Sequence, residues 1–112
     1  MTIIWHNPRC SKSRATLALI EEAGITPEIR RYLDNPPSEA EIREVLALLR
    51  IPAKKLIRKG EALFKELGLE DAGEDRLIKA MAENPKLVER PVVIKDGKAT
   101  LGRPPESVLD IL

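Results

Sequence analysis

The spacing of apolar residues divides the chain into short extended runs and longer helical stretches. Runs rich in β-branched, aromatic and aliphatic residues predict four strands, at 2–5, 28–33, 91–94 and 99–101. The last two flank Asp96-Gly97, a dipeptide typical of tight hairpin turns, so we expect them to pair antiparallel. The first two are separated by the stretch 11–23, whose frequent apolar residues predict a well-buried helix and a right-handed parallel crossover.

Helical periodicity fills the segment between the second and third predicted strands. Ser38 and Glu41 form a capping box ahead of apolar residues spaced i, i+3, i+4 and i+7, which predicts a helix that begins after Ser38. Shorter helices are predicted at 52–57, 61–67 and 74–83. A last helix is predicted at 106–112, behind two prolines that suit a first helical turn.

The resulting order is strand-helix-strand, then helices, then strand-strand-helix. This is the order of the thioredoxin-like fold, so we expect an α/β protein with a mixed four-stranded sheet flanked by helices. A helical insertion at about 38–84 would separate its βαβ and ββα halves. With 112 residues and no stretch that reads as a linker, the chain is expected to form one domain, 1–112.

The amino-acid composition argues against several classes of function. Charged residues make up 33% of the chain but nearly cancel, to a net charge of +1, which argues against a dedicated nucleic-acid or membrane binder. A single cysteine excludes an internal disulfide, so a reducing cytoplasm is the expected compartment. One cysteine and one histidine, with no clustered ligands, also argue against a metal site.

The single cysteine, Cys10, lies between the first predicted strand and the first predicted helix. A helix amino terminus offers unpaired N–H groups and the positive end of a dipole, which favour the nucleophilic thiolate. The alternative is a buried cysteine that acts as a small apolar residue. A partner cysteine would stand at position 13, but Ser13 occupies it, so any disulfide must form with another molecule. The Ser13 hydroxyl either binds a thiolate or oxyanion, or serves the first helical turn.

Three arginines stand out because they lie at element boundaries, where binding groups are common: Arg58, Arg90 and Arg103. Arg90 precedes Pro91, and thioredoxin-like folds commonly carry a proline before the hairpin whose preceding peptide is cis and faces the active thiol. By that analogy Arg90 would lie near Cys10, where a guanidinium could grip a tetrahedral oxyanion. The alternative is a solvated arginine at a strand edge.

Blocks along essentially the whole chain resemble the arsenate reductase family that uses glutathione and glutaredoxin. They are His6-Asn7-Pro8-x-Cys10-x-x-Ser13-Arg14-x-Thr16-Leu17, Tyr32-Leu33-x-Asn35-Pro36-Pro37-Ser38, Leu56-x-Arg58-Lys59, Asn84-Pro85 with Glu89-Arg90-Pro91-Val92-Val93, and Arg103-Pro104-x-Glu106-x-Val108-Leu109-Asp110-Ile111-Leu112. Ser11-Lys12 and the end at Leu112, without a charged tail, are similar to a shorter branch of that family.

The resemblance implies that Cys10 is the nucleophile, that Arg58, Arg90 and Arg103 hold the oxyanion, and that His6 helps tune the thiolate. The chemistry agrees, because arsenate is an anion that repels a thiolate until guanidinium groups neutralise it. The implied cycle forms a Cys10–arsenic adduct, lets glutathione displace an oxygen from arsenic, and takes the final electrons from glutaredoxin. Glutathione would be a co-substrate, with no bound cofactor or metal.

Two other functions fit the same residues. A glutathione-dependent thiol oxidoreductase with another substrate would use the three arginines for a glutathione carboxylate. A non-enzymatic thioredoxin-like regulator is the other, since relatives of that fold bind RNA polymerase and sense disulfide stress. Such sensors typically rely on a C-x-x-C switch, which Ser13 removes.

Overall fold

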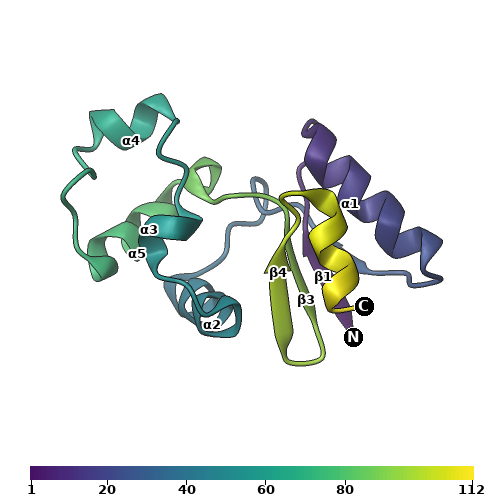
Figure 1. Cartoon of the computed structure of the whole chain (residues 1–112). Coiled ribbons are helices and arrows are strands. Elements are labelled where there is room, and N and C mark those ends of the chain that lie inside the picture. Colours follow the sequence, from purple (N-terminus) through teal and green to yellow (C-terminus); the bar gives the residue numbers. More distant parts are fainter. The chain divides into compact units, whose positions relative to one another are not determined.

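The computed structural model describes residues 1–112, and the chain forms two compact units. The first unit consists of Met1–Asn35 and Arg90–Leu112, and the second consists of Pro36–Glu89. The chain therefore leaves the first unit after its second strand and returns to it just before its third (Figure 1).

A mixed four-stranded sheet forms the centre of the first unit. Its strands are β1 (Thr2–Trp5), β2 (Glu28–Arg30), β3 (Val92–Lys95) and β4 (Lys98–Leu101), in the order β2-β1-β3-β4. β2 is parallel to β1, and β3 is antiparallel to both β1 and β4, so the predicted parallel pairing and the predicted hairpin are confirmed. Asp96 and Gly97 both have positive φ angles, of 47° and 79°, as a tight hairpin turn requires.

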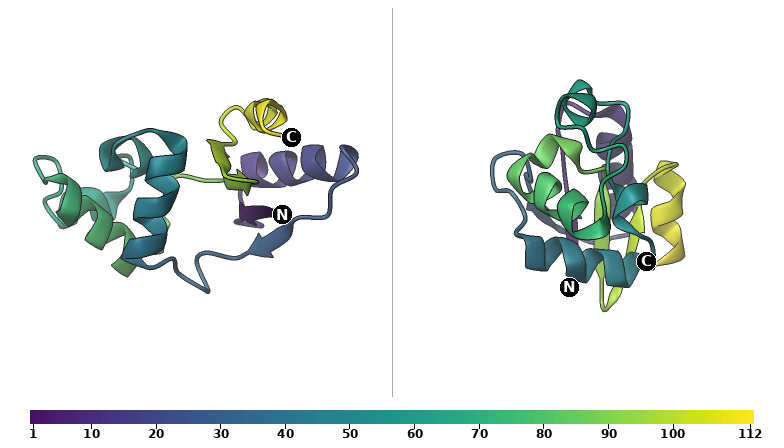
Figure 2. Two further views of the ribbon diagram at one scale, coloured as in Figure 1. Left: turned by 90° about the horizontal axis from the view of Figure 1, so that it is seen from below. Right: turned by 90° about the vertical axis from the view of Figure 1, so that its left-hand side faces the viewer.

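Two helices cover one face of this sheet. Helix α1 (Ser11–Glu22) and the 3₁₀ helix η2 (Pro105–Asp110) lie on the same side of the strands in the left view of Figure 2. Ile4 and Val93 are register partners, so their side chains leave the sheet on one face, where they join Ile20 and Val108 in a buried apolar cluster. This core holds α1 and η2 against the sheet.

The second unit is helical. Its elements are α2 (Glu39–Leu49), α3 (Ala53–Leu56), α4 (Ala62–Glu66), α5 (Glu74–Glu83) and the 3₁₀ helix η1 (Pro85–Leu87). The predicted capping box is confirmed: the Ser38 hydroxyl oxygen accepts the Glu41 N–H at 3.1 Å, and the Glu41 carboxylate accepts the Ser38 N–H at 3.1 Å. The buried face of α2 packs on α5.

Two predicted elements were wrong at their ends. The second strand ends at Arg30 and not at Leu33, because the Arg31 carbonyl accepts the amides of Asp34 and Asn35, at 3.0 and 2.9 Å, and so forms a turn. The final segment is a 3₁₀ helix over Pro105–Asp110, not a helix over 106–112. Hydrogen bonds three residues apart close it, such as the one from the Ser107 N–H to the Pro104 carbonyl at 3.0 Å.

The prediction of a well-buried first helix was also wrong in part. Ala15 and Ala23 are exposed, and the fully buried positions of α1 are Ile20 with the polar Ser13 and Thr16. The two hydroxyl groups are buried because both are hydrogen-bonded: Thr16 donates to the Lys12 carbonyl at 2.8 Å, and Ser13 has partners described below.

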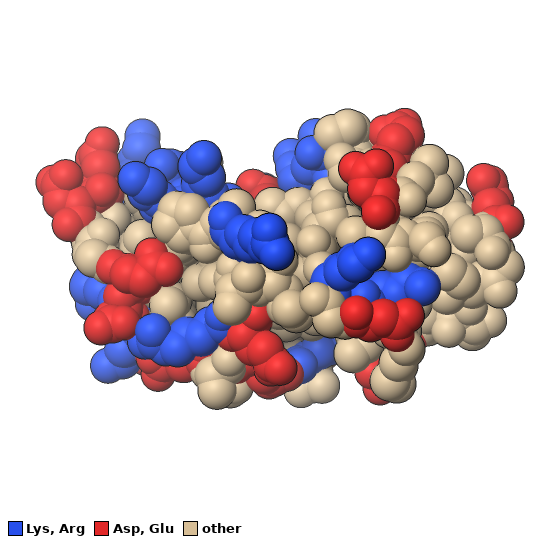
Figure 3. Space-filling view, turned by 60° about the horizontal axis from the view of Figure 1, so that its bottom comes forward, with Lys and Arg blue, Asp and Glu red and all other residues tan.

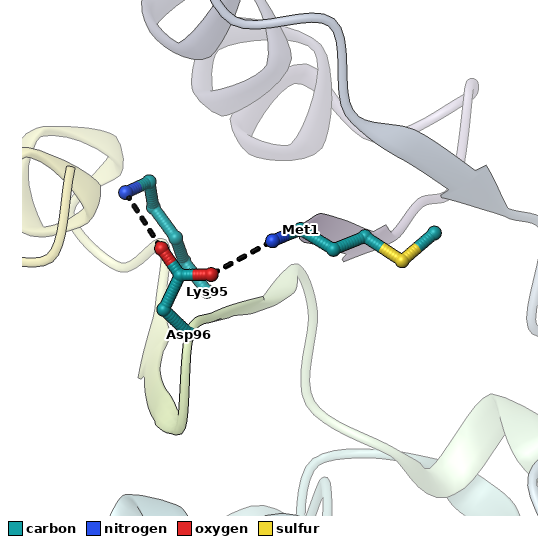
Figure 4. A network of polar contacts seen from close by, with 3 residues as sticks. All are labelled: Met1, Lys95 and Asp96. Atoms are coloured by element: carbon teal, nitrogen blue, oxygen red, sulfur yellow. Dashed lines mark hydrogen bonds and ion pairs between the residues drawn. The ribbon is translucent and has the colours of Figure 1, made fainter.

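The amino terminus is joined to the hairpin turn of the sheet. The Met1 ammonium donates to one carboxylate oxygen of Asp96 at 2.7 Å, and the Lys95 ammonium donates to the other at 3.2 Å (Figure 4). These hydrogen bonds lower the pKa of Asp96. Because the Asp96 side chain is 63% exposed, the pair contributes little to stability. No helix of the fold has the length and apolar character that crossing a membrane requires.

Candidate functional site

Cys10 occupies the N-cap position of α1, in extended backbone conformation. Its N–H donates to the Asn7 carbonyl at 3.0 Å, which closes a turn, and its own carbonyl accepts the Arg14 N–H at 3.0 Å. The thiol is partly exposed and lies outside the apolar cluster of the sheet. The side chain therefore stands where the free N–H groups of the first helical turn can reach it.

The pKa of the Cys10 thiol is lower than the ordinary value of a cysteine. Burial alone would raise that pKa, but the Ser13 backbone N–H, the Arg90 guanidinium and the Lys12 backbone N–H together outweigh burial. Each of these groups directs positive charge toward the sulfur and so favours the thiolate. At neutral pH the site consequently holds more of the nucleophilic form than a free cysteine would.

Arg90 reaches Cys10 from the segment that precedes β3, and its peptide bond to Pro91 is cis. Two of its guanidinium nitrogens, Nε and Nη1, are buried and have no hydrogen-bond partner. Buried N–H groups without acceptors are costly, and an anion with several oxygens would provide the missing acceptors. Arg103 lies beside the same segment, since its Nη1 donates to the Arg90 carbonyl at 3.4 Å.

His6 and Ser13 form a buried polar pair beneath the turn. His6 Nδ1 lies 2.7 Å from Ser13 Oγ, and the Asn7 N–H donates to the same oxygen at 3.1 Å. Burial lowers the His6 pKa, and the positive charges of Arg31 and Arg14 lower it further. The imidazole is therefore neutral at neutral pH and adds no positive charge near the thiol.

Gly102 holds the arginine-bearing segments against α1. Its N–H donates to the Pro91 carbonyl at 3.0 Å. A Cβ at this position would lie 2.7 Å from Pro91 Cγ and closer still to Thr16 Oγ1, so only glycine fits without a shift. Sequence reasoning did not select Gly102 or Thr16; the available signal was a glycine directly after a strand.

Arg58 belongs to the second unit. Its Nη1 lies 3.2 Å from a Glu61 carboxylate oxygen, and its Nε lies 3.9 Å from one of Glu89. Its backbone N–H donates to the Leu87 carbonyl at 2.7 Å. Of the residues selected from the sequence, the first unit thus brings together Cys10 with His6, Ser13, Arg90, Pro91 and Arg103, and Arg58 is oriented by two carboxylates of its own unit.

A cavity of about 280 Å³ adjoins the turn before Cys10; its lining residues are His6, Asn7, Pro8, Arg9, Arg31, Leu33 and Asp34. They follow the carboxyl ends of β1 and β2, which pair in parallel with Trp5 opposite Arg30. The sequence reasoning missed Arg31 and Asp34. The predicted strand at 28–33 hid Arg31, whereas Asp34 lies directly after it, and the ends of two parallel strands meet at one edge of a sheet and commonly line ligand sites.

No cluster of three or more histidine, cysteine, aspartate or glutamate side chains that could hold a metal ion is present. Basic and acidic side chains are interspersed over the face shown in Figure 3. The positive charge that acts on the Cys10 thiol comes from the backbone N–H groups of Ser13 and Lys12 and from the Arg90 guanidinium.

Residues 5–111 match the model of the ArsC family. The chain is 46% identical over 112 residues to an arsenate reductase of Neisseria meningitidis serogroup A, covering 97% of this chain and 96% of the relative. It is 52% identical over 112 residues to the uncharacterized protein YfgD of Escherichia coli K12, covering 97% and 94%.

Among solved structures, the arsenate reductase from Vibrio cholerae is similar, with a TM-score of 0.97 and 48% identity over 99% of this chain and 97% of that one. The predicted α/β fold, a mixed four-stranded sheet with flanking helices, is confirmed by the strand order and by this likeness. The matched length and the sequence identity show that the chain belongs to the ArsC family.

Proposed function

We propose that this protein is an arsenate reductase in which Cys10 is the nucleophile. The observation that carries the proposal is the Arg90 guanidinium, which stabilises the Cys10 thiolate and has two buried nitrogens without acceptors. A tetrahedral oxyanion beside the sulfur would accept hydrogen bonds from both nitrogens. Relatives at 46% identity that are named arsenate reductase favour arsenate over other oxyanions.

In the first step the Cys10 thiolate attacks arsenic, an S–As bond forms, and one arsenate oxygen leaves as water. Arg90 and Arg103 would neutralise the charge of the oxyanion as the sulfur approaches. Arg58 is proposed as the third oxyanion ligand, on the strength of the family resemblance. Its ion pairs with Glu61 and Glu89 would fix the guanidinium before substrate arrives.

The remaining steps need sulfur from outside, because Cys10 is the only cysteine. A glutathione thiol would displace a second oxygen from arsenic as water, which leaves arsenic bound to two sulfurs. A glutaredoxin thiol would then take the glutathione sulfur as a mixed disulfide, and the S–As electron pair would reduce As(V) to As(III). Hydrolysis of the Cys10–arsenic bond would release arsenite. Such a cycle requires reduced thiols, and we therefore place the protein in the cytoplasm.

The test is an NADPH-coupled assay that contains glutathione reductase, glutathione, glutaredoxin and arsenate. We expect arsenate-dependent NADPH oxidation by the wild type and none by Cys10→Ser. Arg90→Ala, Arg103→Ala and Arg58→Ala should each lower kcat/KM for arsenate by about 10²-fold or more. Lys98→Ala, which removes an exposed charge on β4, is the control and should have wild-type activity.

Absence of arsenate-dependent turnover in the wild type would reject the proposal. In that case a glutathione-dependent reduction of hydroxyethyl disulfide that requires Cys10 would indicate a thiol oxidoreductase with another substrate. Inactivity in both assays would favour a non-enzymatic thioredoxin-like regulator.

A further inference from the structure

The proposed chemistry of Cys10 requires a second thiol from another molecule, because the chain has no other cysteine. After Cys10 has formed a covalent bond, a thiol from another molecule must reach that bond to complete any turnover. A binding site for this second thiol rests on the proposed thiol chemistry of Cys10.

The cavity next to the Cys10 turn has the right position. Asn7 and Cys10 are the ends of a tight turn closed by a 3.0 Å hydrogen bond, so their Cα atoms lie within about 7 Å of each other. Asn7 and Arg9 both line the cavity. The Asn7 side chain also accepts the Arg9 N–H at 3.0 Å, which fixes the turn between cavity and thiol. Cys10 itself is not a lining residue, so a thiol compound bound there must extend past Asn7 and Arg9 to bring its sulfur to Cys10.

The charges in the cavity are suited to a zwitterionic ligand. Arg9, Arg31 and Asp34 are among its lining residues and all three are exposed, so its rim carries two cationic side chains and one carboxylate that a ligand can reach from solvent. No hydrogen bond or ion pair joins any of these three side chains to another part of the protein. Two guanidinium groups suit carboxylates, and a carboxylate suits an ammonium group.

We propose that this cavity binds a small peptide thiol of the glutathione type, with Arg31 and Arg9 holding its carboxylates and Asp34 its ammonium group. This assignment places the oxyanion and the peptide thiol at two different positions around Cys10. The oxyanion is bound by Arg90, which enters from the segment before β3, and the thiol is bound at the ends of β1 and β2. It also differs from the alternative in which Arg58, Arg90 and Arg103 hold a glutathione carboxylate.

The test uses a disulfide exchange that contains no arsenate. Cys10 of the full chain is first converted to its mixed disulfide with thionitrobenzoate. An added thiolate then attacks the Cys10 sulfur, forms a new disulfide with it, and expels coloured thionitrobenzoate, whose absorbance gives the rate. Glutathione is compared with β-mercaptoethanol, which has neither carboxylate nor ammonium group. The ratio of the two rates, each corrected for thiolate fraction, cancels any change in the intrinsic reactivity of the Cys10 disulfide.

We expect the wild type to prefer glutathione and to show saturation with it. Arg31→Ala should lower the glutathione to β-mercaptoethanol ratio by about tenfold, as expected for loss of one guanidinium–carboxylate contact. Asp34→Asn should slow glutathione but not N-acetylcysteine, which lacks the ammonium group. Lys98→Ala and Arg103→Ala should leave the ratio unchanged.

Two outcomes would overturn the inference. One is a ratio that is unchanged in Arg31→Ala, or that falls in Arg103→Ala instead. The other is a wild type that reacts with glutathione no faster than with β-mercaptoethanol and accelerates only with a protein thiol such as glutaredoxin. Because arsenate takes no part, a protein without arsenate turnover can still pass this test, and an active arsenate reductase can fail it.

Discussion

The backbone N–H of Gly102 donates to the carbonyl of Pro91 at 3.0 Å, and this contact joins the segment after β4 to the segment that carries Arg90. Gly102→Ala would place a Cβ 2.7 Å from Pro91 Cγ and against the Thr16 side chain. We expect a loss of about 1–3 kcal/mol in the free energy of unfolding, as is typical of overpacking. Urea denaturation measures it.

The matched control is Gly60→Ala, because a Cβ at Gly60 meets nothing within 4 Å. The double variant Gly102→Ala with Thr16→Ala should recover part of the loss, since Thr16 makes the closest of the clashes. Equal stability of Gly102→Ala and Gly60→Ala would contradict the packing described here.

A second prediction concerns the charge on Cys10. Its pKa is lowered, so the rate of alkylation by iodoacetamide should reach half its maximum at a lower pH than for a free cysteine, and should fall as pH falls through that point. Arg90→Ala removes a charge that favours the thiolate and should move the midpoint to higher pH. The neutral-pH rate should drop severalfold, and Lys98→Ala should leave the profile unchanged. A midpoint that does not move in Arg90→Ala would show that the helix amides act alone.

Much of the fold could be predicted because local signals agreed with tertiary packing. The capping box of Ser38 and Glu41 marks the start of α2, and the β-branched run at 92–94 marks β3. The end of β2 could not be predicted, because Arg31-Tyr32-Leu33 has strand-like composition while backbone hydrogen bonds to Asp34 and Asn35 turn the chain. Over six residues, apolar spacing likewise does not separate a 3₁₀ helix from an α-helix.

The site was predictable where one residue carries its own physical signal. Cys10 can be identified from its position at a helix start, and Arg90 can be identified from the proline that follows it. Arg31 carries no such signal, because its proximity to the Cys10 turn depends on parallel pairing of β1 and β2. Nor does sequence disclose that burial and two neighbouring arginines keep His6 uncharged.

A third prediction separates two roles for Ser13. The Ser13 backbone N–H, and not its hydroxyl, helps to lower the Cys10 pKa. The hydroxyl is fully buried and is bonded to His6 and to the Asn7 N–H. Ser13→Ala keeps the amide, so the pH midpoint of Cys10 alkylation should stay near that of the wild type. It removes the hydrogen-bond partner of the buried His6 Nδ1 and of the partly buried Asn7 N–H, so the free energy of unfolding should fall by about 1–3 kcal/mol. Ser107→Ala is the control, and a raised alkylation midpoint in Ser13→Ala would assign the hydroxyl a direct role at the thiolate.

The fourth prediction follows from the single histidine. Burial, Arg31 and Arg14 lower the His6 pKa in the folded protein below its ordinary value of 6.5. An unfolded chain therefore binds a proton at His6 more readily than the folded one does. Stability should be independent of this group above pH 6.5 and should fall as pH is lowered from 6.5 toward the folded-state pKa.

His6→Asn removes the titrating group, so its stability should change less with pH in that window than the stability of the wild type. The comparison is made by urea denaturation above about pH 5, where carboxylates of ordinary pKa remain ionised and do not contribute a slope. Arg31→Ala provides a second arm: it removes one of the charges that lower the His6 pKa, so the pH dependence should weaken without loss of the imidazole. Parallel pH profiles for all three proteins would mean that His6 is protonated equally in the folded and unfolded states, and that the imidazole is not held neutral beneath the Cys10 turn.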